Sequence, residues 1–456
     1  MKRLGAFLCA LHPVLGGCAS DALPSTAPGG VSAAPSTSIG TVATVTWTTS
    51  TATIGYVSYG TTKSLGQSAP LETVASTDHS RTLLGLAPDT TYYYRVITWD
   101  TPNVTAGASE VLSFHTTALP AGTPTLHAQS YEVLDDDGTP EAPMADYVIV
   151  PFVGPNATTI GIADPAGALI WYHVESRDRR VTRARLSADK TSILYAAISD
   201  DNPADSEIVR VAIDGNGTSS VSVPGLGADF AVHPDGTLAV LMADPGATPA
   251  EDGDKIVEID AGGAQKTVFS TFNCFDPAKS PGDGSTDGWS GASALQFDSK
   301  RDVYYLALRN LSSVVQVNRG SGACDWVLGD EDAHTLEFAD DPAAPATTPF
   351  VHPGGIQGGA GRLVVLDADG GPNGSRTVVY ELDFDTSTAT ATHAYDASPR
   401  VDVEQQGEPT VIAGGAVLTN WSNGSRMDLV NESGALKWKL EATSGERLGY
   451  HTAFRD

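Results

Sequence analysis

The sequence predicts an all-β protein: a small β-sandwich followed by a β-propeller. Alternating apolar and polar residues, separated by turn signals, recur along the whole chain, and an internal repeat of roughly 50 residues begins near residue 125. Gly, Thr, Ser, Ala and Val are abundant and lysine is scarce, which also fits strands and turns. With 456 residues, the chain is long enough for two or three domains with full cores.

The first 18 residues are expected to be a lipoprotein signal peptide. Lys2 and Arg3 form a short positive region, and an apolar stretch runs from Leu4 to Leu15. The stretch then ends in Leu-Gly-Gly-Cys18, which resembles a bacterial lipobox, in which the cysteine is acylated. An ordinary signal peptide is the alternative. Residues 19–35 are small and proline-rich, as in a flexible tether. The resemblance implies a lipoprotein of the bacterial cell envelope, in the outer membrane, with the side it faces left open.

The net charge of −28 argues against nucleic acid as a partner, because binding to phosphates needs a basic patch. The same charge argues against direct adsorption to an anionic membrane surface, so the expected membrane contact is the lipid anchor. No apolar run after the leader reaches the roughly 18 residues that span a bilayer.

Two cysteines remain after the leader, Cys274 and Cys324. In an oxidising envelope they are expected to form a disulfide, and two buried thiols are the alternative. A closed loop of this length would stabilise the fold by roughly 4 kcal/mol in the chain-entropy model.

Residues 36–118 are expected to form the β-sandwich. The segment from Leu86 to Tyr92 reads Leu-x-Pro-x-Thr-x-Tyr and resembles the corner between two strands of fibronectin type III domains. Trp47, on an alternating strand, is the expected core tryptophan. A spacer role is expected, since no residue argues for a particular protein or glycan partner.

Residues 125–456 are expected to form the propeller. An acidic or Asn turn, a small residue and a strand that often holds Trp recur six times, with a second turn-and-strand element between them. Two hairpins per repeat fit four-stranded blades, so six blades are predicted, with seven as the alternative. The six turns begin at Asp164, Asp214, Asp260, Asn318, Asp385 and Asn431.

One block of this region carries a family resemblance. Trp289-Ser-Gly-Ala-Ser293 is followed by a strand that ends in Arg309-Asn310 and by a hairpin that ends in Trp326-Val-Leu-Gly329. The block resembles the signature of the PAPS-independent arylsulfate sulfotransferases, which read Asp-Trp-Ser-His-Ala-Asn-Ser-Val and then Ser-Arg-Asn. Gly291 stands where that family has His, and Ser293 stands where it has Asn.

The resemblance implies three blade motifs, each of which supplies a histidine to the central channel, and one of these histidines is transiently sulfated. A neutral imidazole is a suitable nucleophile, and transfer of a sulfuryl group depends on positioning and charge stabilisation, as phosphoryl transfer does. In the other two motifs the histidine positions fall on Ala228 and on Gly354, or on Pro353 when counted back from Gly361. His352 lies one or two residues out of register.

These substitutions predict a catalytically degenerate propeller that acts as a ligand-binding or surface-interaction module, with a small anionic or aryl ligand possible. They also predict a wider channel floor. The alternative is an active enzyme that moves a sulfuryl group from an aryl sulfate to a phenol through His352 and Arg309. Arg309 would otherwise pair with a carboxylate. The alternative gains support if both side chains meet at a common point in the channel.

No metal or other cofactor is expected. Asp367-Ala-Asp-Gly-Gly-Pro-Asn373 has oxygen ligands at alternate positions, as calcium loops do, but Glu381 is too far along the chain to complete an EF-hand pattern. Calcium is the alternative.

Overall fold

The computed structural model confirms the all-β prediction. In the residues that it describes, the secondary structure consists of strands and of short 3-10 helices at Pro203–Asp205, Thr271–Asn273 and Ser422–Gly424. None of the helices in these ranges is long and apolar enough to cross a membrane. The structure describes residues 26–101, 104–135, 137–246, 248, 251–284, 288–329, 333–339, 349–369 and 374–455. The signal peptide, Cys18 and most of the predicted tether lie outside these ranges.

The chain forms two compact units. The first consists of a segment that ends at Ala33 together with Val45–Arg81 and Tyr92–Phe114. The second consists of Ala34–Thr44, Thr82–Thr91 and the chain from His115 onward.

The N-terminal strands form one hydrogen-bonded sheet in which the long strand β2 has several partners. Strand β2 pairs with β1, β3, β4 and β5, and β5 pairs with β6 and β7. A strand that changes partner along its length is typical of the corner between two layers of a sandwich. Strand β1 covers part of the segment that was expected to be a tether. The strands are β1 (Gly29–Pro35), β2 (Ala43–Gly60), β3 (Gln67–Ser68), β4 (Ser76–Leu83), β5 (Thr91–Thr101), β6 (Val104–Ala108) and β7 (Leu112–His115).

Trp47 lies in the core of this sheet, as predicted, and is 1% exposed. Its indole stacks on the imidazole of His79 at a centroid distance of 4.8 Å. The Nδ1 atom of His79 lies 2.7 Å from the carboxylate of Glu72, so a buried polar ring has a partner for its polar edge.

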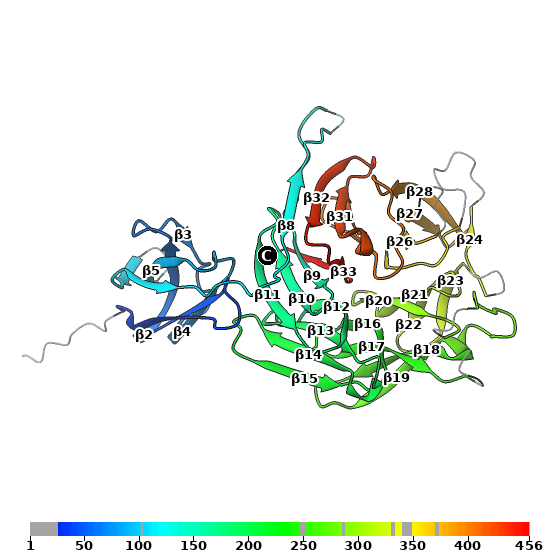
Figure 1. Cartoon of the computed structure of the whole chain (residues 1–456), viewed down its shortest axis with the longest axis horizontal. Helices are drawn as coiled ribbons and strands as arrows, with labels where there is room; N and C mark the ends of the chain where they lie inside the picture. The colour runs from blue at the N-terminus through cyan, green and yellow to red at the C-terminus, as the bar shows by residue number, and fades with distance from the viewer. Residues whose placement is uncertain are drawn as a thin grey trace, which may run out of the picture. The chain divides into compact units, whose positions relative to one another are not determined.

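The rest of the chain forms a six-bladed β-propeller, which confirms the first of the two predicted blade counts. Six sheets follow one another around a ring (Figure 1): β9–β11 with β33 and β34, β12–β15, β16–β19, β20–β23, β24–β28, and β29–β32 with β8. The strands are β8 (Leu126–Ser130), β9 (Tyr147–Val153), β10 (Thr158–Ala163), β11 (Leu169–Glu175), β12 (Arg180–Leu186), β13 (Ser192–Ile198), β14 (Glu207–Ala212), β15 (Thr218–Ser222), β16 (Leu226–Val232), β17 (Leu238–Asp244), β18 (Gly253–Ile259), β19 (Gln265–Ser270), β20 (Ala292–Asp298), β21 (Val303–Leu308), β22 (Ser313–Asn318), β23 (Cys324–Leu328), β24 (Glu337–Phe338), β25 (Ile356–Gly359), β26 (Arg362–Asp367), β27 (Arg376–Asp383), β28 (Thr388–Asp396), β29 (Glu408–Val411), β30 (Val417–Asn420), β31 (Arg426–Val430), β32 (Leu436–Ala442), β33 (Arg447–Leu448) and β34 (Thr452–Phe454).

Both ends of the propeller region close the ring. The C-terminal strand β34 pairs with β9 in the register Thr452↔Ile149, and β8 pairs with β32 in the register Ser130↔Trp438. In Figure 1 the red end of the chain therefore lies beside the first, green blade. Closure provides hydrogen-bonded partners for strand edges that would otherwise be open to aggregation.

Two tryptophans of the predicted repeat join neighbouring blades. Trp171 and Trp438 are fully buried, and each donates its indole N–H to a carbonyl of the next blade, at Ile213 and Pro165. The predicted disulfide is present between Cys274, just after the 3-10 helix Thr271–Asn273, and Cys324 at the start of β23. It joins the segment that follows the third blade to the outer strand of the fourth.

Candidate functional site

The inner strands of neighbouring blades lie side by side around the axis: β9 with β12, β12 with β16, β16 with β20, β20 with β25 and β25 with β29. Three of these inner strands are bulged: β12 between Val181 and Ala184, β16 between Leu226 and Phe230, and β20 between Ala292 and Ala294. A bulge redirects side chains locally and is common beside functional sites. The bulges in β12 and β16 turn Arg183 and Asp229 toward the same point.

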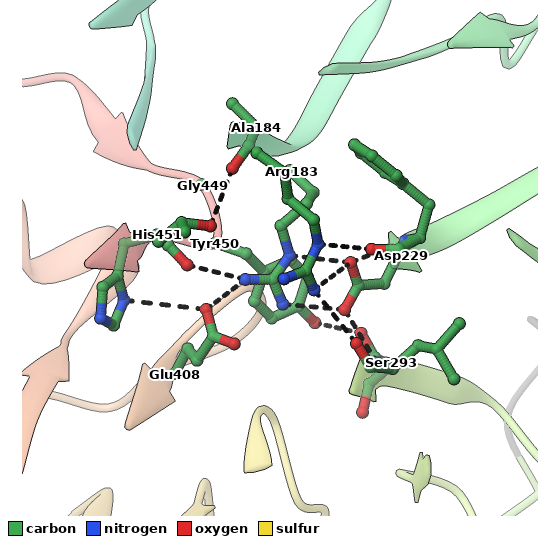
Figure 2. A network of polar contacts seen from close by, with 12 residues as sticks. Arg183, Ala184, Asp229, Ser293, Glu408, Gly449, Tyr450 and His451 are labelled. Atoms are coloured by element: carbon green, nitrogen blue, oxygen red, sulfur yellow. Dashed lines mark hydrogen bonds and ion pairs between the residues drawn. The ribbon is translucent and has the colours of Figure 1, made fainter. Parts of the chain in front are cut away.

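Arg183 is the centre of a buried ionic network (Figure 2). Its guanidinium donates to both oxygens of Asp229, at 2.7 and 2.8 Å, in the bidentate geometry that favours strong pairing. It also donates to the carboxylate of Glu408 and, at 2.8 Å, to the carbonyl of His451. Arg183 is 1% exposed, so these groups replace its hydration entirely.

Tyr450 links the network to the remaining blades. Its ring lies under the guanidinium of Arg183, 4.4 Å from the ring centroid. Its hydroxyl contacts the carbonyls of Ser293, at 2.5 Å, and Gly354, at 3.1 Å. Tyr450 and the two carbonyls come from three blades, and Arg183, Asp229 and Glu408 come from the other three. Each of the six blades therefore contributes a group to the axis.

A second arginine approaches from the same strand. Arg185 donates to the carbonyls of Phe230, at 2.5 Å, and Leu295, at 3.1 Å, and lies 3.4 Å from Asp229. Burial and the neighbouring guanidinium of Arg183 lower the pKa of Arg185. Asp229 also accepts the backbone N–H of Leu295 at 2.8 Å, so its two oxygens are fully used.

The network decides the protonation of its members. Burial opposes the charge on Arg183, but Asp229 and Glu408 outweigh it and raise the pKa of Arg183. Burial raises the pKa of Glu408, against the lowering effect of Arg183. Burial, reinforced by Arg183 and Arg185, lowers the pKa of His451 to about 3. His451 is therefore a neutral imidazole, and Nδ1 lies 3.7 Å from the carboxylate of Glu408.

The structure brings the predicted pair of His352 and Arg309 together beside Asp369, and neither residue is a member of the network around Arg183. Arg309 donates to the backbone carbonyl of His352 at 3.1 Å, and the side chains of both residues approach the same oxygen of Asp369, at 3.7 Å from Arg309 and 2.6 Å from Nδ1 of His352. The other ring nitrogen of His352 lies 3.2 Å from Asp283. The imidazole is thus held between two carboxylates, on the segment that precedes β25.

Comparison with known families agrees with this architecture. Residues 146–345 match the model described as "Arylsulfotransferase (ASST)". This part of the chain is an arylsulfotransferase-like propeller. Residues 28–116 match the model described as "Purple acid Phosphatase, N-terminal domain", a fibronectin type III-like domain, as was predicted for this region. No curated protein matches the chain in sequence.

Several solved structures share low similarity with the chain. A protein of unknown function from Bacteroides caccae is 12% identical over 69% of this chain and 100% of its own, with a TM-score of 0.45. A chain of a nidogen/laminin complex is 11% identical over 68% and 98%, with a TM-score of 0.44. Virginiamycin B lyase from Staphylococcus aureus is 12% identical over 69% and 88%, with a TM-score of 0.37. Similarity at this level says nothing about function.

At two of the three predicted motif positions in the arylsulfotransferase-like propeller, a side chain would meet its neighbours, so these two positions do not supply the wider channel floor that was expected. Gly291 has φ +59°, and a Cβ atom there would lie 2.5 Å from the side chain of Asn310. At Gly354 a Cβ atom would meet Leu366 at 3.0 Å. Ala228 lies within the bulge of β16, next to Asp229. At Gly291 and Gly354, neighbouring side chains therefore lie where a larger side chain would begin.

Sequence reasoning missed the axial network. Its members are Arg183, Arg185, Asp229, Glu408, Tyr450 and His451. One signal was available: β12 reads Arg-Val-Thr-Arg-Ala-Arg-Leu, and arginines on an inner propeller strand need carboxylates at the axis. Asp229, directly after the substituted Ala228, was the natural candidate.

The structure adds no support for the calcium alternative. Asp367 is buried and ion-paired with Arg376 at 2.7 Å, Asp369 contacts His352, and Asn373 lies outside the described residues. Within the described ranges, no three His, Cys, Asp or Glu side chains are arranged to hold a metal ion. The absence of a cofactor stays a prediction.

Proposed function

We propose that the chain is a catalytically degenerate arylsulfotransferase-like propeller that binds a small aryl ligand, carried on a lipoprotein of the bacterial cell envelope. The observation that carries the proposal is the surroundings of His352. It is the histidine nearest to the motif positions, and both of its ring nitrogens face carboxylate oxygens, at 2.6 and 3.2 Å.

A sulfuryl donor is anionic, and nucleophilic attack needs a ring nitrogen with a clear approach. At His352 the donor would meet the oxygen of Asp283 or Asp369 before it reached the ring. Like charges in close contact disfavour such binding by several kcal/mol. The axial arginines cannot compensate, because Arg183 is already paired with Asp229 and Glu408 inside the network.

A second candidate is sulfotransfer through a relocated site. One observation favours it: Asp369 contacts Nδ1 of His352, as an orienting carboxylate does in catalytic dyads, and Arg309 lies beside them. In this mechanism Nε2 of His352 would attack the sulfur, and the S–O bond to the aryl leaving group would break. A phenol would then take the sulfuryl group and return the free imidazole.

The test is transfer from p-nitrophenyl sulfate to phenol, followed by release of p-nitrophenol. We expect no turnover above the rate without protein. The matched control for the histidine substitution is His127→Ala, which removes an exposed imidazole on β8 and should behave as the native chain does. Turnover by the native chain that His352→Ala and Arg309→Ala both abolish would establish the second candidate and overturn the first.

The envelope location rests on the sequence alone. The lipobox-like end at Cys18 and the net charge of −28 support a lipid-anchored protein that does not adsorb to anionic surfaces by itself. Lipid attachment is the proposed membrane contact.

A further inference from the structure

A cavity of about 630 Å³ lies where the fourth and fifth blades meet. This volume suits a small organic ligand. Its apolar wall includes Phe338, Phe350, Leu311 and Leu336, and the rings of Phe338 and Phe350 meet edge-on with centroids 5.4 Å apart. An aromatic ring fits a wall of this kind, because edge-on and offset contacts between rings are favourable.

The polar groups of the cavity are acidic or neutral. Asp283 and Glu337 line it, together with Asn310 and Ser312. Among the described lining residues there is no lysine or arginine, and the one imidazole, His334, lies 3.7 Å from Glu337.

An arginine next to the cavity in the sequence is engaged with other groups. Arg309, one residue before the cavity-lining Asn310, has its guanidinium on the carbonyl of His352 and near Asp369.

We infer that this cavity binds an aromatic ligand that carries a cationic amine, not an aryl sulfate. The inference rests on the proposed function, and it names the ligand class: the ring lies on Phe338, which packs on the buried Phe350, and the ammonium faces Asp283 and Glu337. Acidic walls attract the amine and reject an anion of the same shape, so charge supplies the specificity.

The test is calorimetric titration of the full chain at pH 8, where free imidazoles are neutral. The probes are three para-substituted phenols of similar size: tyramine, which is cationic, 4-ethylphenol, which is neutral, and 4-hydroxyphenylacetate, which is anionic. We expect tyramine to bind most tightly, 4-ethylphenol about three- to tenfold more weakly, and 4-hydroxyphenylacetate not measurably.

Variants locate the site. Glu337→Gln and Asp283→Asn should each weaken tyramine binding about three- to fivefold and leave 4-ethylphenol unchanged, as expected for one partly exposed charge pair. The control, Asp201→Asn, removes an exposed carboxylate of the second blade and should change nothing. Absence of binding by all three probes, or binding of the anion as tight as that of tyramine, would overturn the inference. Absence of all binding would also count against the proposed aryl-ligand function, whereas tight binding of the anion would leave that function standing. Turnover of p-nitrophenyl sulfate would overturn the proposed function without deciding whether tyramine binds, so the two proposals fail by different results.

Discussion

At the scale of single residues, the buried charges at the propeller axis pair with one another. Arg183 is matched by Asp229 and Glu408, and each partner accepts a hydrogen bond from it. Removal of one member of such a pair costs about 3–5 kcal/mol, because the other charge is left buried and unmatched. The network therefore holds the inner strands of different blades in fixed relative positions, and its charges are not available to a ligand.

His451 makes the stability of the propeller depend on pH. The pKa of His451 is about 3 in the folded chain and 6.5 for the free side chain. Between these pH values the unfolded chain therefore binds a proton that the folded chain does not bind. The stabilising contribution is complete above pH 6.5 and is lost at about 1.4 kcal/mol per pH unit as the pH falls toward 3. His451→Leu removes this dependence. In urea unfolding at pH 7 and pH 5, we expect the variant to gain about 2 kcal/mol over the native chain on acidification.

The control for this prediction is His127→Leu, which replaces an exposed imidazole. It should leave the difference between the two pH values as it is in the native chain. A constant difference between His451→Leu and the native chain at both pH values would show that the pKa of His451 is the same in the folded and the unfolded chain, and would contradict the prediction. At pH 7, His451→Leu should change the free energy of unfolding little, since neither ring nitrogen of His451 makes a hydrogen bond to a described residue.

At Gly291 the backbone conformation and a neighbouring side chain both favour glycine. Its φ of +59° suits glycine, and the side chain of Asn310 occupies the place of a Cβ atom while it donates to the carbonyl of Gly288 at 2.8 Å. A histidine at this position would strain the backbone and displace Asn310.

At the scale of elements, strands were predictable because their signals are local. The alternation in β21 and β22 and the repeated turns around Asn318 and Asn431 specify hairpins within a few residues. The bulges of β12 and β16 were not predictable, since their sequence pattern is that of an ordinary strand. These bulges position Arg183 and Asp229. The sequence therefore did not predict the site, because the site lies where the strands depart from regular strand geometry.

The disulfide is the element-scale contact that can be removed most cleanly. It joins residues 50 positions apart in the sequence, and the chain-entropy model assigns it roughly 4 kcal/mol. We expect the Cys274→Ser, Cys324→Ser double variant to lower the free energy of unfolding by up to about this amount, measured as a lower urea midpoint. The native chain in dithiothreitol should unfold at the same midpoint as the double variant. Equal midpoints for the oxidised chain and the double variant would contradict the prediction.

At the scale of the whole molecule, the fold was easier to predict than the site. Six repeats of one supersecondary unit predict six blades without knowledge of any distant contact. The axial network depends on contacts that no local pattern records: Arg183 and Glu408 are 225 positions apart, and Arg183 and His451 are 268 apart. Such groups meet only when β34 pairs with β9 and closes the ring.

The lipid anchor is a prediction about the whole molecule, since it decides where both units act. Cys18→Ser should abolish acylation in a Gram-negative host, because the thiol is the proposed acceptor. The variant should leave the membrane fraction, since several acyl chains give stable anchoring that the acidic chain cannot supply by itself. The measurements are incorporation of labelled palmitate and the distribution between membrane and soluble fractions. The matched control is Cys9→Ser, which lies within the apolar stretch and should keep both label and location. Label in Cys18→Ser equal to that in the native chain would refute the anchor, and an unlabelled native chain would point to an ordinary signal peptide.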